Sequence, residues 1–393
     1  MRWNERTVCM TLRDSRRVRI CSGMIEGRQS EAEAANALQL SVRQVRRLKR
    51  RVTDEGDGGV IHRSRGRASP RRTPDEVRTE VEGLYRETYS GWNIQHFSEW
   101  LSSEHNMTLS RETLRQILIH EESRPKRRAG KRHHKCRDPR GREGELLQWD
   151  TSIHSWLGEE GEKAVLIAAI DDATKKIVWA EFFEHDGVIE NMTVLRAIVR
   201  KYGIFNALYA DGSTKFFRPD DEEIKARERG VRKEYTQFGR VANELGIQMI
   251  RAGSPQAKGR VERSFRTDQD RLVKELALKG IKTRSEANRY LKQRFIPHYN
   301  RLFAVVPADP FPFWEKPEKP FDELNMFCIK DHRKVQNDLT ISVDGERWQI
   351  HSGVRSGDEV ELRLRLDRSV HIYKKDKEVG YHRIKRVADA ASD

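Results

Sequence analysis

Three acidic residues occupy positions at which carboxylates from separate structural elements could meet. Asp150 ends an apolar run at 146–149, and Asp211 directly follows a second run at 206–210. Glu262 falls about two turns into a long helical pattern. Carboxylate oxygens bind hard divalent cations, and two such ions can activate the attacking oxygen and stabilise the leaving oxygen of a phosphoryl displacement. We therefore predict Asp150, Asp211 and Glu262 as the catalytic and metal-binding set.

The order of the three acids carries this prediction more than any one of them. An aspartate that follows a strand is usually a turn or capping residue. Asp171 and Asp172 are competing acids, but they fall in an apparent hairpin turn and are left out of the set. Three carboxylates that meet without cations would repel one another in a partly buried cleft, so the set itself implies bound metal.

Basic residues accompany the third acid on the same helical pattern. Lys258 lies one turn before Glu262 on the same helix face, and Arg263 directly follows Glu262. We predict that Lys258 and Arg263 contact a phosphate backbone beside the acids. Surface salt bridges are the alternative.

The pattern around the acids predicts a mixed α/β core. Apolar runs predict strands at 146–150, 163–171, 176–183, 206–210 and 247–251, and helices at 189–202, 236–245 and 254–279. Three antiparallel strands, followed by helix, strand, helix, strand and helix, is the order of a ribonuclease-H-like fold. In such a sheet the strands before Asp150 and Asp211 are neighbours, so the two carboxylates can converge.

Residues 12–51 have the pattern of a helix-turn-helix DNA-binding unit. Capping boxes at 30–33 and 41–44 open two short helices. The second helix is expected to turn three apolar residues inward: Val42, Val45 and Leu48. Its predicted DNA-binding residues are Arg43, Arg46, Arg47 and Arg50. A basic helix that only faces solvent is the alternative.

A second helical unit is predicted from residue 74 to about residue 121. Apolar positions mark two helices, and Ser110 caps a third. This third helix offers Arg111 and Arg115 as further DNA-binding residues.

Charge is distributed unevenly along the chain. The formal net charge is +15, and residues 1–143 hold 32 Lys and Arg against 20 Asp and Glu. Such a surplus suits a polyanion, because binding phosphates releases condensed counterions. Residues 123–143 are densely basic and are predicted to be an irregular connector that lies on phosphates.

The composition also bears on the compartment. The four cysteines are scattered and form no Cys-x-x-Cys pair, as in a reduced cytosolic protein. The longest apolar stretch, 164–170, is too short to cross a membrane. The first 20 residues contain several arginines, whereas a signal peptide would have an apolar run there. We therefore expect a cytoplasmic protein without a membrane partner.

These patterns divide the chain into seven segments. They are a helix-turn-helix domain (1–60), a basic linker (61–73), a second helical DNA-binding domain (74–122), the basic connector (123–143), the catalytic core (144–305), a Pro-rich linker (306–326) and a small β-barrel (327–393). The barrel is predicted from strand patterns at 339–343, 347–350, 359–366 and 370–373. The fold class is thus α/β, with a ribonuclease-H-like core between N-terminal helix-turn-helix units and a small C-terminal β-barrel.

Several motifs resemble the integrase-core transposases of bacterial insertion sequences, and the ISNCY group is the nearest type. They are Gly144–Asp150, Ile170–Thr174, Tyr209–Gly212, Ser254–Arg263 and Tyr299–Phe303. The resemblance extends into the N-terminal helix-turn-helix and covers most of the chain. One departure is the strongly charged stretch at about 216–235, which lengthens the gap before Glu262.

The resemblance implies an Asp-Asp-Glu transposase in which Asp150, Asp211 and Glu262 hold two Mg²⁺ ions, for which Mn²⁺ can substitute. It implies cleavage at the element's ends and joining of the 3′ ends to target DNA. The implied partners are double-stranded DNA, as terminal inverted repeats and as target, and further copies of the chain on paired ends. The implied setting is the bacterial nucleoid. A DNA-binding regulator with a decayed core and a ribonuclease-H-like nuclease are the alternatives.

Overall fold

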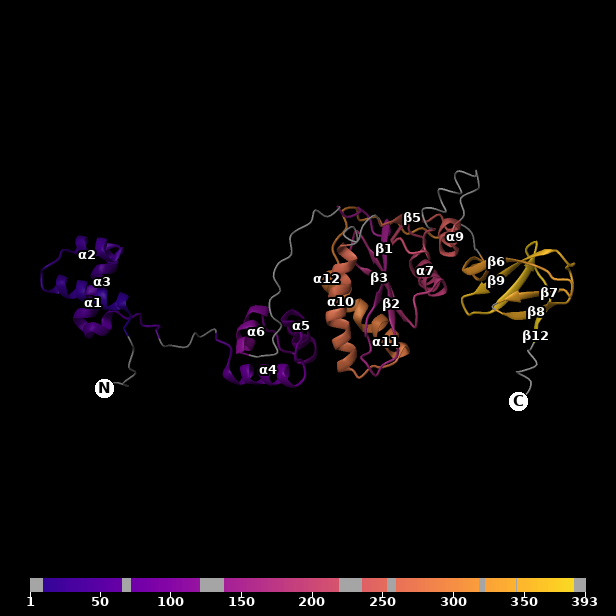
Figure 1. The fold of residues 1–393 in the computed structure, drawn as a ribbon. Coiled ribbons are helices and arrows are strands. Elements are labelled where there is room, and N and C mark those ends of the chain that lie inside the picture. Colours follow the sequence, from indigo (N-terminus) through magenta and orange to yellow (C-terminus); the bar gives the residue numbers. More distant parts are fainter. Residues whose placement is uncertain are drawn as a thin grey trace. The chain divides into compact units, whose positions relative to one another are not determined.

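The computed structural model describes residues 10–65, 72–120, 138–218, 235–252, 259–317, 322–343 and 345–384. For residues 259–268 the description covers the backbone only. The chain divides into two compact units, residues 1–83 and 84–393. Figure 1 labels the helices and strands of both units. Within the described residues, no helix combines the length and apolar character needed to span a bilayer.

The first unit opens with three short helices whose ends carry side-chain caps. They are α1 (Leu12–Ile25), α2 (Glu31–Leu38) and α3 (Val42–Glu55), followed by the 3₁₀ turn η1 (Gly56–Val60). Both predicted capping boxes are confirmed, because Ser30 and Ser41 exchange hydrogen bonds with Glu33 and Gln44. A small buried cluster joins the helices: Ile20, Cys21, Met24, Ala34, Ala35, Val45, Val52 and Val60.

The inward face of α3 differs in one residue from the prediction. Val45 is buried and Leu48 packs against the cluster, as predicted. Val42 is 38% exposed, so the prediction for Val42 is wrong. Val42 is the first residue of α3, where the helix has not yet reached the cluster.

Helix α4 (Asp75–Glu87) crosses the boundary between the two units. The second unit continues with α5 (Ile94–Glu104), α6 (Arg111–Ile117) and the 3₁₀ turn η2 (Leu118–His120). Aromatic rings fill this part, with Tyr85 packing edge-on against Phe97 at 5.2 Å between ring centroids. Ser110 caps α6, as predicted, by accepting the N–H of Thr113.

A five-stranded sheet forms the centre of the second unit. Its strands are β1 (Leu146–Ile153), β2 (Val165–Asp171), β3 (Ile177–Phe183), β4 (Ala207–Ala210) and β5 (Gln248–Arg251), in the order β3-β2-β1-β4-β5. The first three strands pair antiparallel, and β4 pairs parallel with both β1 and β5. The three antiparallel strands and the neighbouring positions of β1 and β4 agree with the prediction of a ribonuclease-H-like core.

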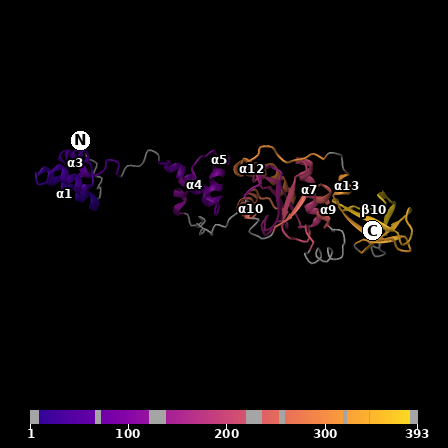
Figure 2. The same cartoon turned by 90° about the horizontal axis from the view of Figure 1, so that it is seen from above.

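Helices cover both faces of the sheet (Figure 1, Figure 2). They are α7 (Val188–Tyr202) and α9 (Gln237–Glu244) on one face, and α10 (Gly259–Leu278), α11 (Arg284–Tyr290), the π-helical turn η4 (Leu291–Phe295) and α12 (Ile296–Phe303) on the other. Trp149 of β1 packs with α7 and α9, whereas Leu166 and Ala168 of β2 pack with α10. All seven residues of β2 are buried, as expected of a strand covered on both faces.

The segment predicted as a Pro-rich linker lies along the core in its described part. Backbone N–H groups of Asp309 and Phe313 bond to the carbonyls of Gly141 and Glu143, at 2.9 and 2.7 Å. Gly203, with a φ of +110°, lies so close to the next part of this segment that a Cβ would stand 2.6 Å from the carbonyl oxygen of Glu315. These contacts fix residues 309–315 beside the N-terminal ends of β1 and β4.

The C-terminal region forms two sheets and, within the residues described, no closed barrel. The helix α13 (Glu323–Met326) precedes β6 (Cys328–Lys334), β7 (Thr340–Val343), β8 (Glu346–Ile350), β9 (Glu359–Arg365), β10 (Val370–Lys374), β11 (Lys377–Glu378) and β12 (Tyr381–Ile384). The sheets have the orders β11-β10-β9-β6 and β12-β8-β7 and share one buried core. In place of the predicted barrel the structure has two packed sheets, because among the residues described β6 pairs with β9 alone and the first sheet stays open.

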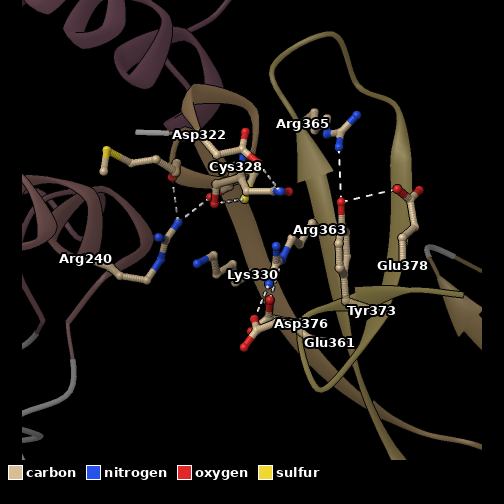
Figure 3. Close-up of polar contacts among 12 residues, drawn as sticks. Arg240, Asp322, Cys328, Lys330, Glu361, Arg363, Arg365, Tyr373, Asp376 and Glu378 are labelled. Carbon is tan, nitrogen blue, oxygen red and sulfur yellow. Dashed lines mark hydrogen bonds and ion pairs between the residues drawn. The ribbon is translucent and has the colours of Figure 1, made fainter. Parts of the chain in front are cut away.

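Side-chain to backbone bonds attach this region to the core (Figure 3). Gln237 of α9 pairs with both backbone groups of Lys330, donating to its carbonyl at 2.6 Å and accepting its N–H at 3.0 Å. Arg240 donates to the carbonyls of Met326 and Cys328. Side chains of α9 thus form hydrogen bonds with backbone groups of β6, as a neighbouring strand would.

Candidate active site

Two of the three predicted acids lie at one level on neighbouring parallel strands. The register of β1 and β4 pairs Gln148 with Tyr209. Asp150 and Asp211 each follow two residues later, so they stand level with each other and on one side of the sheet. Asp150 is half-buried and Asp211 is exposed, which leaves the pair open to solvent and ligands.

The surroundings of the two aspartates differ. Strand β1 continues through Ile153, so Asp150 lies within the strand, and the prediction that it ends the strand is wrong. Pairing with β2 on its other side extends the strand, with Asp150 opposite Ala168. Asp211 begins the loop after β4, where its Oδ1 accepts the N–H of Ser213 at 3.1 Å.

The face of β1 that carries Asp150 is the face covered by α10. Ala168, opposite Asp150, belongs to the buried cluster that includes Leu272 and Leu276 of α10. Gln269 Nε2 of α10 donates to Ser152 Oγ of β1 at 3.0 Å. Since Ser152 is two residues after Asp150, this bond anchors α10 over the face that Asp150 shares.

The position of the third acid follows from that anchor. Position 262 lies seven residues before Gln269, which is about two turns or 10 Å along α10 and on the same side of the helix. The N–H of Glu162, in the loop after β1, bonds to the carbonyl of Lys282, just beyond α10. Helix α10 therefore runs in the direction of β1, and its first turns point back toward the level of Asp150.

Several predicted residues lie beyond what the structure describes. The side chains of Glu262 and Arg263 are outside the described residues, and Lys258 lies outside them entirely. Among the residues described, no group of three or more His, Cys, Asp or Glu side chains is arranged to hold a metal ion. The donors that are described, the carboxylates of Asp150 and Asp211, are the hard oxygen type that Mg²⁺ prefers.

The two aspartates left out of the predicted set have structural contacts. Asp171 is buried and accepts the N–H of Gly144 at 2.8 Å and the N–H of Thr174 at 2.7 Å. Burial raises the pKa of Asp171. Asp172 accepts the N–H of Arg140 at 2.8 Å and also a bond from the side chain of Gln148. Both carboxylates thus bond the residues just before β1 to the turn between β2 and β3.

The predicted DNA-binding arginines of α3 are all exposed. Arg46 pairs with Glu31 at 2.6 Å. In the described part of the chain no carboxylate pairs with Arg43, Arg47 or Arg50. On α6, Arg111 is exposed, whereas Arg115 is held in a two-pronged pair by Glu112.

Comparison with known proteins decides the family. The chain is 36% identical over 341 residues to a Sinorhizobium fredii (strain NBRC 101917 / NGR234) protein named "Putative transposase y4bF", covering 86% of this chain and 73% of that protein. It is 29% identical over 327 residues to the "Transposase for insertion sequence IS1202" of Streptococcus pneumoniae, covering 74% of this chain and 69% of that protein. The chain belongs to the insertion-sequence transposases.

Solved structures similar to this transposase include retroviral integrases. The catalytic core domain of BIV integrase has a TM-score of 0.25 and 17% identity over 38% of this chain and 85% of that one. The HTLV-2 integrase catalytic core in complex with magnesium has a TM-score of 0.27 and 15% identity over 39% of this chain and 91% of that one. No family model matches the chain. The fold assignment rests on the observed strand order.

The transposase also has a buried polar joint between α5 and α10 that the sequence did not predict. His96 Nε2 lies 2.8 Å from Glu275 Oε1, and the hydroxyl of Tyr290 donates to Glu275 Oε2 at 2.7 Å. Arg271 forms a two-pronged pair with Glu99 beside them. His96, Arg271 and Glu275 are each no more than 5% exposed. The only sequence signal is the four-residue spacing of Trp92, His96 and Trp100, of which the last two lie on α5.

Proposed function

We propose that this transposase binds the ends of its element, cleaves them and joins the 3′ ends to target DNA, with Asp150, Asp211 and Glu262 as its catalytic residues. One observation carries the proposal: Asp150 and Asp211 lie side by side at the same height of the adjacent parallel strands β1 and β4. Both are on the sheet face that α10 covers. Glu262 is the acid on α10 that the helix geometry brings nearest to that level.

The carboxylates of the proposed site would hold two Mg²⁺ ions, with Mn²⁺ as a substitute. When bound, these ions would activate the attacking oxygen and neutralise charge on the leaving oxygen. Asp150, held within β1, supplies a fixed carboxylate, and Asp211 supplies one on a loop that can adjust to the substrate. Lys258 and Arg263, which flank Glu262 in the sequence, would contact the DNA backbone beside the site.

The proposed DNA-reading parts are the segments 1–60 and 74–122, which the basic linker 61–73 joins. In the first of them, α3 presents Arg43, Arg46, Arg47 and Arg50 to solvent. The connector 123–143 would lead DNA to the core 144–305, followed by the segments 306–326 and 327–393. We further propose that copies of the chain assemble on paired inverted repeats in the bacterial nucleoid.

A strand-transfer assay tests the catalytic set. Full-length protein, labelled DNA carrying the element's own ends, and Mg²⁺ or Mn²⁺ are incubated, and nicked and joined products are measured. Asp150→Asn, Asp211→Asn and Glu262→Gln should each abolish both products while end binding persists. Asp270→Asn, which changes another acid of α10, should leave both products unchanged.

Two outcomes would contradict the proposal. Joining by all three acid variants would remove the assigned residues from the site. Tight end binding without cleavage by the wild type would instead favour a DNA-binding regulator.

A further inference from the structure

The outer surface of α7 borders two adjoining hollows. The first, of about 420 Å³, lies between α7, the edge strand β3 and η4. The second, of about 190 Å³, lies between α7, α13 and the turn after β9. Thr193 and Arg196 line both hollows, so the two form one continuous surface, the α7 track.

Positive charge dominates the α7 track. Its cationic lining residues are Arg196, Arg200, Lys201, Lys292 and Arg365, against the acids Glu181 and Asp367. Glu181 already pairs with Lys292 at 2.7 Å. Within the described residues no carboxylate pairs with Arg196 or Lys201, so their charge is available to an anionic ligand.

An aromatic ring holds two of these cations in place. Trp179 of β3 is half-buried, and its Nε1 donates to Glu181 at 3.0 Å. Lys201 Nζ lies 5.7 Å from the centroid of the Trp179 ring, and Lys292 Nζ lies 5.0 Å from it. Cation–π attraction of this kind favours both ammonium groups beside the ring, and it leaves the charge of Lys201 available because, unlike Lys292, Lys201 has no carboxylate partner among the described residues.

The second hollow contains a further cation with unused hydrogen-bonding capacity. Arg365 of β9 donates one bond, to the hydroxyl of Tyr373 at 3.2 Å. Its buried Nε has no hydrogen-bond partner among the residues described. Because that Nε is enclosed by protein, Arg365 acts on a ligand in the hollow through its positive charge and the remaining N–H groups of its guanidinium.

We propose that the α7 track binds the sugar–phosphate backbone of duplex DNA, at a place separate from the candidate active site. Helix α7 packs on the sheet face opposite to the one that α10 covers, so this DNA segment is not the one beside Asp150. The proposal rests on the proposed function only in taking DNA as the ligand.

The dimensions of the track fit a nucleic-acid backbone. Thr193 and Lys201 lie eight residues apart on α7, or about 12 Å along its axis. Each strand of a duplex carries one phosphate per about 3.4 Å of duplex axis, so the length of the stripe is comparable to a few nucleotides. Cations that meet phosphates position DNA without reading its bases. Binding at the α7 track is therefore independent of sequence.

A salt titration with full-length protein tests the proposal. The probe is a short duplex of arbitrary sequence, and the variants are Arg196→Glu/Lys201→Glu and the milder Arg196→Gln/Lys201→Gln. Lys163→Glu/Lys175→Glu is the matched control, because both lysines are exposed on the core and neither lines the track. The track variants should bind about tenfold more weakly and reduce the slope of log K against log salt by about 2.

Chemical protection locates the contact directly. Acetylation of lysines is measured by mass spectrometry with and without the duplex. Bound DNA should protect Lys201 and Lys292 and should leave Lys163 and Lys175 as reactive as before.

The possible results separate the two proposals. Duplex binding by the wild type that the track variants retain in full, without protection of Lys201, overturns the α7 track alone. Absence of duplex binding by the wild type overturns both the track and the proposed function. Unchanged DNA binding with a changed oligomeric mass would make the surface an interface between copies and would also overturn the proposal.

Discussion

Charged side chains cluster in two places, the joint between α5 and α10 formed by His96, Glu99, Arg271 and Glu275, and the outer face of α3. The two clusters differ in burial and in pairing. In the joint, Arg271 and Glu275 are buried and matched with Glu99 and His96. On the outer face of α3, Arg43, Arg46, Arg47 and Arg50 are exposed, and among the residues described only Arg46 of these four forms an ion pair, with Glu31. The buried, paired side chains of the joint fix the position of α5 against α10. The exposed arginines of α3 without a carboxylate partner can instead bind an anionic ligand.

The joint also matters because of the helix on which it lies. Helix α10 carries position 262 near its start, the Gln269 anchor to β1 near its middle, and Glu275 near its end. Lys274 adds a bond from its ammonium group to the carbonyl of Gly91 at 3.0 Å. The helical part that includes α5 is therefore fastened to the helix that bears the third proposed catalytic acid.

Removal of Glu275 should have the largest effect. Glu275→Ala leaves His96 and the hydroxyl of Tyr290 buried without their shared acceptor. Each buried donor left without its acceptor costs about 1–3 kcal/mol, so a loss of about 4 kcal/mol is expected when both lose Glu275. Urea unfolding of the full chain, followed by tryptophan fluorescence, measures the loss, because Trp92 and Trp100 pack against His96.

Asp270→Ala is the matched control on the same helix. Its pair with Lys274 is partly exposed, and ion pairs at the surface contribute about 0.5 kcal/mol. Equal losses for the two variants would show that the joint is no more important than a surface ion pair.

The second prediction concerns the Arg271–Glu99 pair. Arg271→Met alone strands the half-buried Glu99 and removes the guanidinium that lies 4.9 Å from the ring centroid of Phe303, so a loss of about 3 kcal/mol is expected. The double variant Arg271→Met/Glu99→Met should recover most of that loss, because neither charge is then buried alone. A double-mutant cycle in urea measures this recovery. Additive losses would mean that the pair is not coupled.

The contrast between the two regions also shows which features a sequence can predict. The core strands were predictable because β2 is a continuous apolar run, and the N-terminal helices because their capping boxes are local signals. The level placement of Asp150 and Asp211 followed from the strand order. The joint was not predictable, because His96 and Glu275 are 179 residues apart and no local pattern links them.

Other misses have the same origin. The Pro-rich composition of the segment before residue 320 indicated a spacer, yet Phe313 and Asp309 bond to the core. The predicted barrel failed because strand patterns give the strands but not the pairs that would close them. The sequence predicted local structure well, but it did not predict which distant residues contact one another.

The third prediction tests the unpaired arginines of α3. Arg47→Ala should weaken binding to the element's ends and lower the salt slope by about 1, because one phosphate contact is lost. Arg46→Ala should have a smaller effect, since Arg46 must first leave Glu31. Binding measured across a range of salt concentrations gives both values. Unchanged slopes for both variants would count against α3 as the DNA-reading helix.

The smallest expected effect is a pH dependence that arises in the joint. Burial lowers the pKa of His96 below its ordinary value of 6.5, although the neighbouring Glu275 opposes the shift. Between the lowered pKa and 6.5 the unfolded chain binds more protons than the folded chain. The contribution of His96 to stability is therefore complete above pH 6.5 and decreases as the pH falls through that window.

Urea unfolding between pH 7.5 and 5.5 measures this dependence, and His298 must be separated from it. Burial also lowers the pKa of His298, so both histidines change stability in the same direction. His96→Gln should remove one part of the slope and His298→Gln the other, because each variant lacks one of the two titrating imidazoles. A slope that survives in the double variant would place the titrating group outside the joint. A stability that rises as the pH falls would mean that His96 is charged in the folded chain, and the joint would then be an ion pair of the kind formed by Arg271 and Glu99.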